Sequence, residues 1–137
     1  MKKISSIIGA IVLCSVFLCA FSVNVFAYSG ALDTYSGWCG ASGLTTSDSW
    51  LNDDGVFYVD HKITAAGGGG SAGSMEVSAK QKQWWGYEVK KTLTLTRTIG
   101  TYALTFTVPN GEYKLFFKAI NNKDLRIDFN GTVYDDK

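Results

Sequence analysis

The sequence predicts an all-β domain, a small antiparallel β-sandwich of about six or seven strands. Apolar and polar residues alternate with a period of two through most of the chain after residue 54. Gly, Asn and Pro separate these alternating runs at short intervals, as turn residues do. No segment after the first 27 residues repeats its apolar residues at the period of a helix. A small β-barrel is the alternative architecture.

The first 27 residues have the pattern of a secretory signal peptide. Two lysines at positions 2 and 3 precede an apolar run of roughly 17 residues, which is long enough for a membrane anchor as the competing interpretation. Val25 and Ala27 then occupy the −3 and −1 positions of a cleavage site, which favours removal of the segment. We therefore predict a secreted, extracellular protein, with residues 1–27 as a cleaved leader and residues 28–137 as one domain.

Composition narrows the class of protein. The chain has 137 residues, of which 46% are hydrophobic and 18% charged, with a net charge of +1. It is too apolar for a disordered protein, too short for two ordinary domains, and too weakly basic to predict a nucleic-acid partner. Cys39 is the single cysteine beyond the leader, so no internal disulfide is available and the core alone must stabilise the fold. This favours a bacterial protein over a disulfide-dense secreted scaffold.

The first half of the domain divides into four segments. Residues 28–54 are rich in Gly, Ser, Thr and Asp and predict an irregular lead-in with at most short strands. Residues 55–64 alternate clearly and predict a strand, and residues 75–80 predict a second, shorter strand. Between them, residues 65–74 (AAGGGGSAGS) predict a mobile Gly-rich loop, because glycine loses the most backbone entropy on ordering.

The second half contains a change in the parity of its apolar residues. From Trp85 to Ile99 these residues share one parity, and after Gly100-Thr101 they take the other parity. We interpret the change as a two-residue type II′ turn that pairs Leu93 with Val108 across a hairpin.

Two further strands are predicted towards the end of the chain. Residues 112–120 and 125–129 alternate apolar and polar residues, and each run is preceded by turn residues. Asn130-Gly131 is a strong hairpin signal and predicts one last turn before the chain closes.

Trp84 leads the set of candidate ligand-binding residues. It lies opposite to the core parity and therefore shares a predicted outer face with polar residues. An exposed indole beside such groups stacks on a sugar or lies at a lipid interface. The simpler alternatives are that Trp84 packs under a loop and that the threonines are ordinary solvated strand residues. The predicted ligand-binding residues are Trp84, Glu88, Lys90, Thr92 and Thr94.

The remaining constellations predict no catalytic site, metal or cofactor. Cys39 and His61 are the only thiol and imidazole of the domain, and no family signature surrounds the cysteine. Glu88 and Glu112 alternate with core residues, so we expect them to face solvent rather than to form the carboxylate pair of a glycosidase. An oxygen-rich cluster suits calcium, but it departs from the EF-hand pattern. That cluster comprises Asp48, Asn52, Asp53 and Asp54.

These observations favour a secreted, non-enzymatic binding or interaction module. Its expected partner is an extracellular glycan, an envelope surface or another protein, and no nucleic acid. The basic segment 80–97 is compatible with peripheral contact to an anionic membrane. The alternative function is a bacteriocin-like or toxin factor acting on a target cell envelope, although no long amphipathic helix is present in the sequence to insert. The third hypothesis is a small enzyme, in which Cys39 and His61 are the only obvious catalytic pair.

Overall fold

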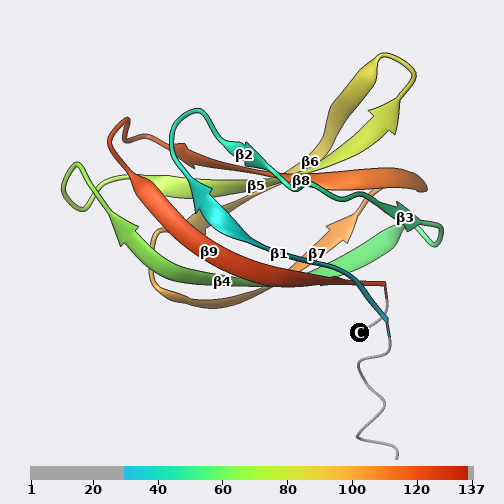
Figure 1. Ribbon diagram of the computed structural model, residues 1–137, viewed down its shortest axis with the longest axis horizontal. Coiled ribbons are helices and arrows are strands. Elements are labelled where there is room, and N and C mark those ends of the chain that lie inside the picture. The colour runs from blue at the N-terminus through green and yellow to red at the C-terminus, as the bar shows by residue number, and fades with distance from the viewer. Residues whose placement is uncertain (1–29, 136–137) are drawn as a thin grey trace, which may run out of the picture.

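The computed structural model describes residues 30–135, and the predicted leader 1–27 lies outside this range. Nine strands form two antiparallel sheets that pack face to face as a sandwich (Figure 1). The predicted all-β sandwich is confirmed, with more strands than the six or seven expected. The two sheets stay separate among the described residues, so the alternative of a small closed barrel is wrong. Residues 30–135 include no helix with the length and hydropathy needed to cross a membrane.

Most connections between consecutive strands run from one sheet to the other. The first sheet runs in the order β1 (Ala31–Cys39), β9 (Arg126–Tyr134), β4 (Val56–Gly67), β7 (Gly100–Thr107). The second sheet runs in the order β2 (Leu44–Thr45), β8 (Gly111–Ile120), β5 (Ser74–Gln83), β6 (Gly86–Thr96), and β3 (Trp50–Asn52) also pairs with β8. Of the pairs in these sheets, β5 and β6 alone are consecutive in sequence. The chain therefore crosses repeatedly from one sheet to the other.

The core lies between the sheets and is rich in aromatic rings. Phe57 and Phe106 are fully buried and stack at 5.0 Å between ring centroids, with Trp50 edge-on to Phe57 at 5.4 Å. At the other end Phe117 and Phe129 pack at 4.4 Å. Strand side chains alternate between the two faces of a sheet, so each of these rings comes from the inward parity of its strand.

The segment 28–54, expected to be an irregular lead-in, contains the nine-residue strand β1. Its inward positions opposite β9 are Asp33, Tyr35, Gly37 and Cys39. Two of these four are not apolar, while the outward Trp38 is 52% exposed. The strand therefore lacks the apolar alternation by which strands are recognised in a sequence.

The predicted turn at Gly100-Thr101 is wrong. Strand β6 pairs with β5 in the second sheet, whereas β7 begins at Gly100 and pairs with β4 in the first sheet. Residues 97–99 carry the chain across the sandwich, so Leu93 and Val108 are not partners in any ladder. Both sheets face the same core, so the inward residues in the last part of β6 are odd-numbered and those of β7 are even-numbered. A two-residue hairpin turn produces the same change of parity.

The hairpin expected at Asn130-Gly131 is also absent. Strand β9 passes straight through these residues and pairs with both β1 and β4. Gly131 is required there for space: a Cβ atom would meet the hydroxyl group of Tyr35 and lie 2.6 Å from the carbonyl oxygen of Asp60. The glycine marks a close approach between strands rather than a turn.

The Gly-rich loop is shorter than predicted, because β4 continues to Gly67 and β5 begins at Ser74. Its carbonyl groups are held by two side chains from elsewhere. Arg97 donates to the carbonyls of Gly70 and Ala72 at 2.9 and 2.7 Å, and Asn122 donates to that of Ala72 at 2.9 Å. Arg97 follows the end of β6 and Asn122 follows the end of β8, so the loop is tied to the ends of these two strands.

Candidate functional site

The β5–β6 hairpin (yellow in Figure 1) projects beyond the rest of the sandwich. Gln83 pairs with Gly86, which leaves Trp84 and Trp85 as the two residues of the turn. Gly86 has φ 137°, a conformation that glycine adopts without the steric cost that a Cβ atom brings. The local sequence therefore places two adjacent indoles at the tip of the projection.

Both indoles are exposed to solvent. Trp84 is 92% exposed and Trp85 is 59% exposed, and their rings meet edge to face at 5.2 Å and 85°. The expected exposure of Trp84 is found, and it does not pack under a loop. The expectation that Trp85 lies on the core side is wrong, because the turn removes it from the strand alternation.

A β-bulge explains why the next residues also leave the core. Ala79 pairs with Lys91 but Lys80 pairs with Val89, so Lys90 is an extra residue without a partner in the ladder. The extra residue shifts the parity of β6. Leu93 beyond the bulge faces inward, whereas Tyr87 and Val89 lie on the outer face of the second sheet, 37% and 49% exposed.

The bulge also divides the predicted ligand-binding residues. Thr92 and Thr94 lie on the outer face, where the hydroxyl of Thr92 is 2.8 Å from that of Ser78. Glu88 pairs with Gln81 on the opposite side of the hairpin, and its carboxylate accepts a bond from Lys90 at 2.8 Å. The five residues predicted as one surface therefore do not form one, and the structure groups Trp84 with the tip.

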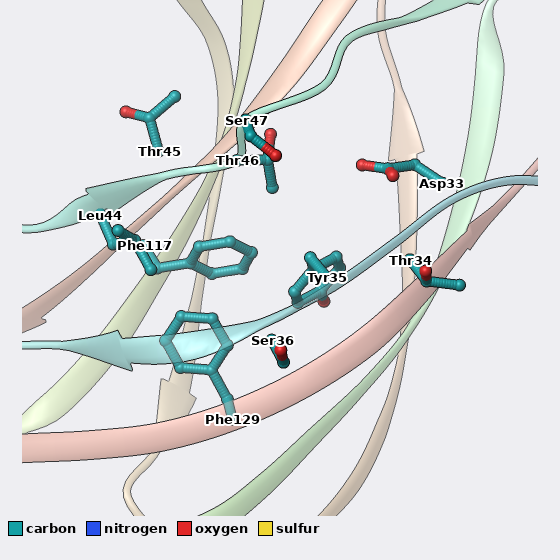
Figure 2. A pocket seen from close by; sticks show the side chains of 10 residues that line it. All are labelled: Asp33, Thr34, Tyr35, Ser36, Leu44, Thr45, Thr46, Ser47, Phe117 and Phe129. Carbon is teal, nitrogen blue, oxygen red and sulfur yellow. The ribbon is translucent and has the colours of Figure 1, made fainter.

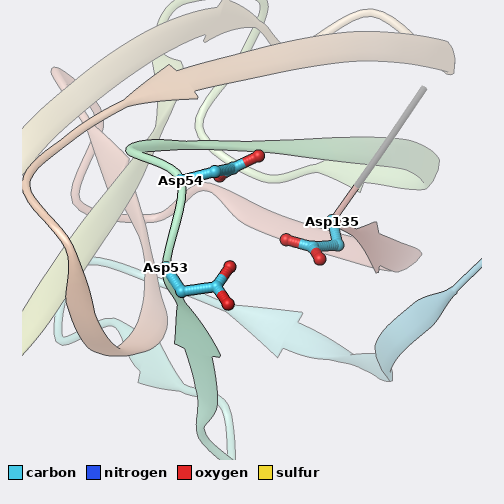
Figure 3. A group of neighbouring side chains, drawn as sticks. All are labelled: Asp53, Asp54 and Asp135. Carbon is cyan, nitrogen blue, oxygen red and sulfur yellow. The ribbon is translucent and has the colours of Figure 1, made fainter.

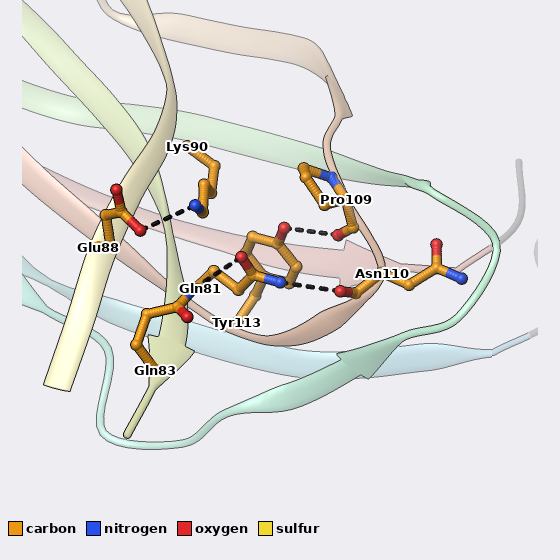
Figure 4. Close-up of polar contacts among 7 residues, drawn as sticks. All are labelled: Gln81, Gln83, Glu88, Lys90, Pro109, Asn110 and Tyr113. Atoms are coloured by element: carbon orange, nitrogen blue, oxygen red, sulfur yellow. Dashed lines mark hydrogen bonds and ion pairs between the residues drawn. The ribbon is translucent and has the colours of Figure 1, made fainter. Parts of the chain in front are cut away.

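The side chains on the inner side of the hairpin are polar, and they form hydrogen bonds with other groups of the protein (Figure 4). Gln83 donates to the side-chain oxygen of Gln81 at 2.9 Å, and Gln81 donates to the carbonyl of Asn110 at 2.8 Å. The hydroxyl of Tyr113 donates to the carbonyl of Pro109. The bond from Gln81 to Asn110 joins the base of the projection to the β7–β8 connection, so it helps to hold the hairpin in place.

The outer side of the hairpin joins apolar rings to ammonium groups. The Lys80 Nζ lies 3.8 Å from the centroid of the Phe116 ring, and the Lys114 Nζ lies 5.3 Å from that of Tyr87. Lys82 forms an ion pair with Glu112 at 3.1 Å. That bond raises the pKa of Lys82, and the pKa of Glu112 is lowered by hydrogen bonds from Ser49 and Lys82.

No family model and no curated protein matches this chain. Besides the tip and the outer side of the hairpin, the described residues include three other candidate groups: a hollow beside β1, an acidic cluster and the catalytic pairs considered from the sequence.

A hollow of about 360 Å³ opens between β1 and the segment that carries β2 (Figure 2). Hydroxyl groups and the carboxylate of Asp33 line its rim, and burial raises the pKa of that carboxyl. Its aromatic floor is formed by Tyr35, Phe117 and Phe129. Phe117 and Phe129 are only 1% and 3% exposed, so of the three floor rings only the half-buried Tyr35 is open to solvent.

The acidic cluster is rearranged relative to the expected calcium ligands. The carboxylates of Asp53, Asp54 and Asp135 lie within 4.8 Å of one another (Figure 3). Asn52 is buried and donates to the carbonyl of Pro109 at 3.3 Å, so it belongs to the core. Asp54 accepts a bond from the backbone of Val56 at 3.1 Å, which is an ordinary turn contact. Asp53 and Asp54 are exposed and Asp135 is half-buried, and exposed acidic groups are common without an ion.

The catalytic pairs considered from the sequence do not assemble. Cys39 is 1% exposed, and burial raises the pKa of its thiol to about 11. His61 is fully buried beneath aromatic rings, and burial lowers its pKa to about 4. Glu88 and Glu112 lie on opposite faces of the second sheet, since one pairs with Gln81 and the other alternates with the inward Tyr113. Cys39 and His61 are closed off from solvent, and each of the two glutamates is bonded to a lysine rather than to the other carboxylate.

Proposed function

We propose that this protein is a secreted, non-enzymatic module that binds a cell-envelope membrane by placing the Trp84–Trp85 tip in the bilayer interface. The observation that carries the proposal is the exposure of two adjacent indoles at the end of a projecting hairpin. Trp is the residue most typical of the membrane–water interface, because its ring is apolar and its N–H group bonds to water or headgroups.

The shape of the site supports a membrane over a glycan. Sites for small molecules are concave and enclose their ligands, whereas the tip projects outward. The polar side chains nearest to it, Gln81, Gln83 and Glu88, already bond to protein groups. Tyr87 and Val89 extend the apolar surface from the tip along the outer side of the hairpin. Burying half of each indole, about 100 Å² per ring, is worth about 5 kcal/mol before the cost of association.

Binding to lipid vesicles tests this proposal. Residues 28–137 are titrated with vesicles, and tryptophan emission and co-sedimentation are followed. We expect a blue shift on binding and at least a tenfold weaker partition for the Trp84→Ala/Trp85→Ala variant. Trp38→Ala is the matched control, because Trp38 is also exposed but lies on the outer face of the first sheet, against Arg126. Vesicle binding that is absent, or equal in the tip variant, overturns the proposal.

Two further arms of the same experiment distinguish membrane binding from glycan binding and from a toxin-like activity. A panel of cell-wall glycans replaces the vesicles, and a saturable emission change that is lost in Trp84→Ala identifies a glycan-binding module instead. Vesicles loaded with a self-quenched dye report on the bilayer itself. A binding module leaves the dye inside, whereas release at low protein concentration identifies the toxin-like alternative.

A further inference from the structure

We infer that the outer face of the second sheet docks on anionic lipid headgroups while the Trp84–Trp85 tip lies in the interface. This inference rests on the proposed membrane binding and adds the charge of the target and the face that meets it. We call this surface the lysine face. It comprises Lys80, Lys82, Lys114 and Lys118, which share the outward parity of β5 and β8.

The charge of the molecule is unevenly divided between its two outer faces. On the lysine face, four lysines lie among two carboxylates, those of Glu76 and Glu112. On the outer face of the first sheet the charges balance: Lys62 and Arg126 lie with Asp60 and Asp128. The sandwich therefore has one positive face and one neutral face, and an anionic surface attracts the first.

Aromatic rings, rather than carboxylates, hold two of these lysines. Lys80 lies over Phe116 and Lys114 lies over Tyr87, at 3.8 and 5.3 Å from the ring centroids. A cation–π contact positions an ammonium group but leaves its net charge uncompensated. A face that carries both ammonium groups and aromatic rings suits the headgroup region, where charged headgroups and apolar chains lie within a few ångströms of one another.

The lysine face and the tip lie on the same side of the molecule. In Figure 1 the hairpin rises on the side of the second sheet that is turned away from the first sheet. Tyr87 and Val89 connect the tip to Lys80 and Lys114 across the outer side of β6. Insertion of the tip therefore brings the lysines towards the headgroups, and charges within a Debye length of about 10 Å attract one another.

Partition into vesicles of different charge tests the inference. Residues 28–137 are titrated with neutral phosphatidylcholine vesicles and with vesicles that contain about 30% phosphatidylglycerol. We expect at least about 25-fold tighter binding to the anionic vesicles and a roughly 25-fold loss of that gain in Lys80→Gln/Lys114→Gln, since each lysine near the surface contributes about fivefold. Lys62→Gln/Lys123→Gln is the matched control, because both of its lysines are exposed and outside the lysine face.

The outcomes separate this inference from the function on which it rests. Equal binding to neutral and anionic vesicles, or equal losses in the two lysine variants, overturns the lysine face while the tip variant still reports insertion. Absence of binding to either vesicle overturns both. Soluble polyphosphate is a third arm: saturable binding to it, without vesicle binding, shows that the lysines recognise an anionic polymer and also overturns the inference.

Discussion

The hydroxyl of Tyr35 and the Nδ1 atom of His61 lie 2.7 Å apart and share a hydrogen bond inside the sandwich. Phe117 and Phe129 pack against the imidazole at 5.5 and 5.3 Å between ring centroids. His61 is fully buried, and desolvation lowers its pKa from 6.5 to about 4. The folded protein therefore holds this imidazole neutral where the unfolded chain protonates it.

We predict that the free energy of unfolding falls as the pH drops from about 6.5 to about 4. The unfolded state binds the proton first, so protonation favours unfolding, by roughly 3 kcal/mol in total for a shift from 6.5 to about 4. Urea unfolding at a series of pH values measures this loss. In His61→Gln the slope between pH 6.5 and 5 is expected to vanish, and a wild type that is flat over this window contradicts the prediction.

Strands were predictable where each has one face in the core and one in water. Strands β4, β7 and β8 alternate accordingly, and the sequence indicates them. Their partners were not predictable in this way, because both sheets face one core. Parity says that Leu93 and Phe106 point inward, and it does not say in which sheet each lies. Hence the crossing at residues 97–99 was mistaken for a hairpin.

The candidate site was predictable at one residue. Trp84 was predicted as the leading ligand-binding residue on an outer face, with packing under a loop as the alternative, and it is exposed because it lies in the turn. The exposure of Trp85, Tyr87 and Val89 was not predicted, because a turn and the bulge at Lys90 shift the parity. Gly86 is the one residue that marks the turn, and no residue type marks the bulge. The lysine face brings together β5 and β8, which are about 30 residues apart in sequence and pair only through the sheet.

Gly131→Ala is predicted to destabilise the fold by about 2 kcal/mol or more. The new methyl group would meet the Tyr35 hydroxyl and the backbone of Asp60, so either β1 or β9 must shift. Thermal and urea unfolding measure the loss. Gly67→Ala is the matched control, because a Cβ atom there has no heavy atom within 4 Å. A Gly131→Ala variant as stable as this control shows that β1 yields without cost.

Cys39 is predicted to be a slow thiol in the folded protein. It is 1% exposed, and burial raises its pKa to about 11, so little thiolate forms at pH 8. We expect its reaction with an aromatic disulfide reagent to be about two orders of magnitude slower in the native protein than in guanidinium. Rapid native labelling, or a reducible dimer on a non-reducing gel, contradicts this burial.

Asn122 is predicted to hold the Gly-rich loop. Its amide group lies 3.2 Å from the carbonyls of Gly68 and Gly69, and its Oδ1 atom accepts a bond from the backbone of Asp124 at 3.1 Å. Asn122→Asp keeps the shape and the acceptor but replaces the donor with a charge that the loop carbonyls repel. The expected loss is about 1–3 kcal/mol in the free energy of unfolding.

Hydrogen exchange and limited proteolysis locate that loss. Residues 68–73 are expected to exchange and to be cleaved faster in Asn122→Asp than in the wild type, since the donated bonds to their carbonyls are gone. Lys123→Ala, next to it in the same turn and exposed, is the matched control and is expected to leave both rates unchanged. If the loop of Asn122→Asp is protected as in the wild type, Arg97 alone, through Gly70 and Ala72, holds it.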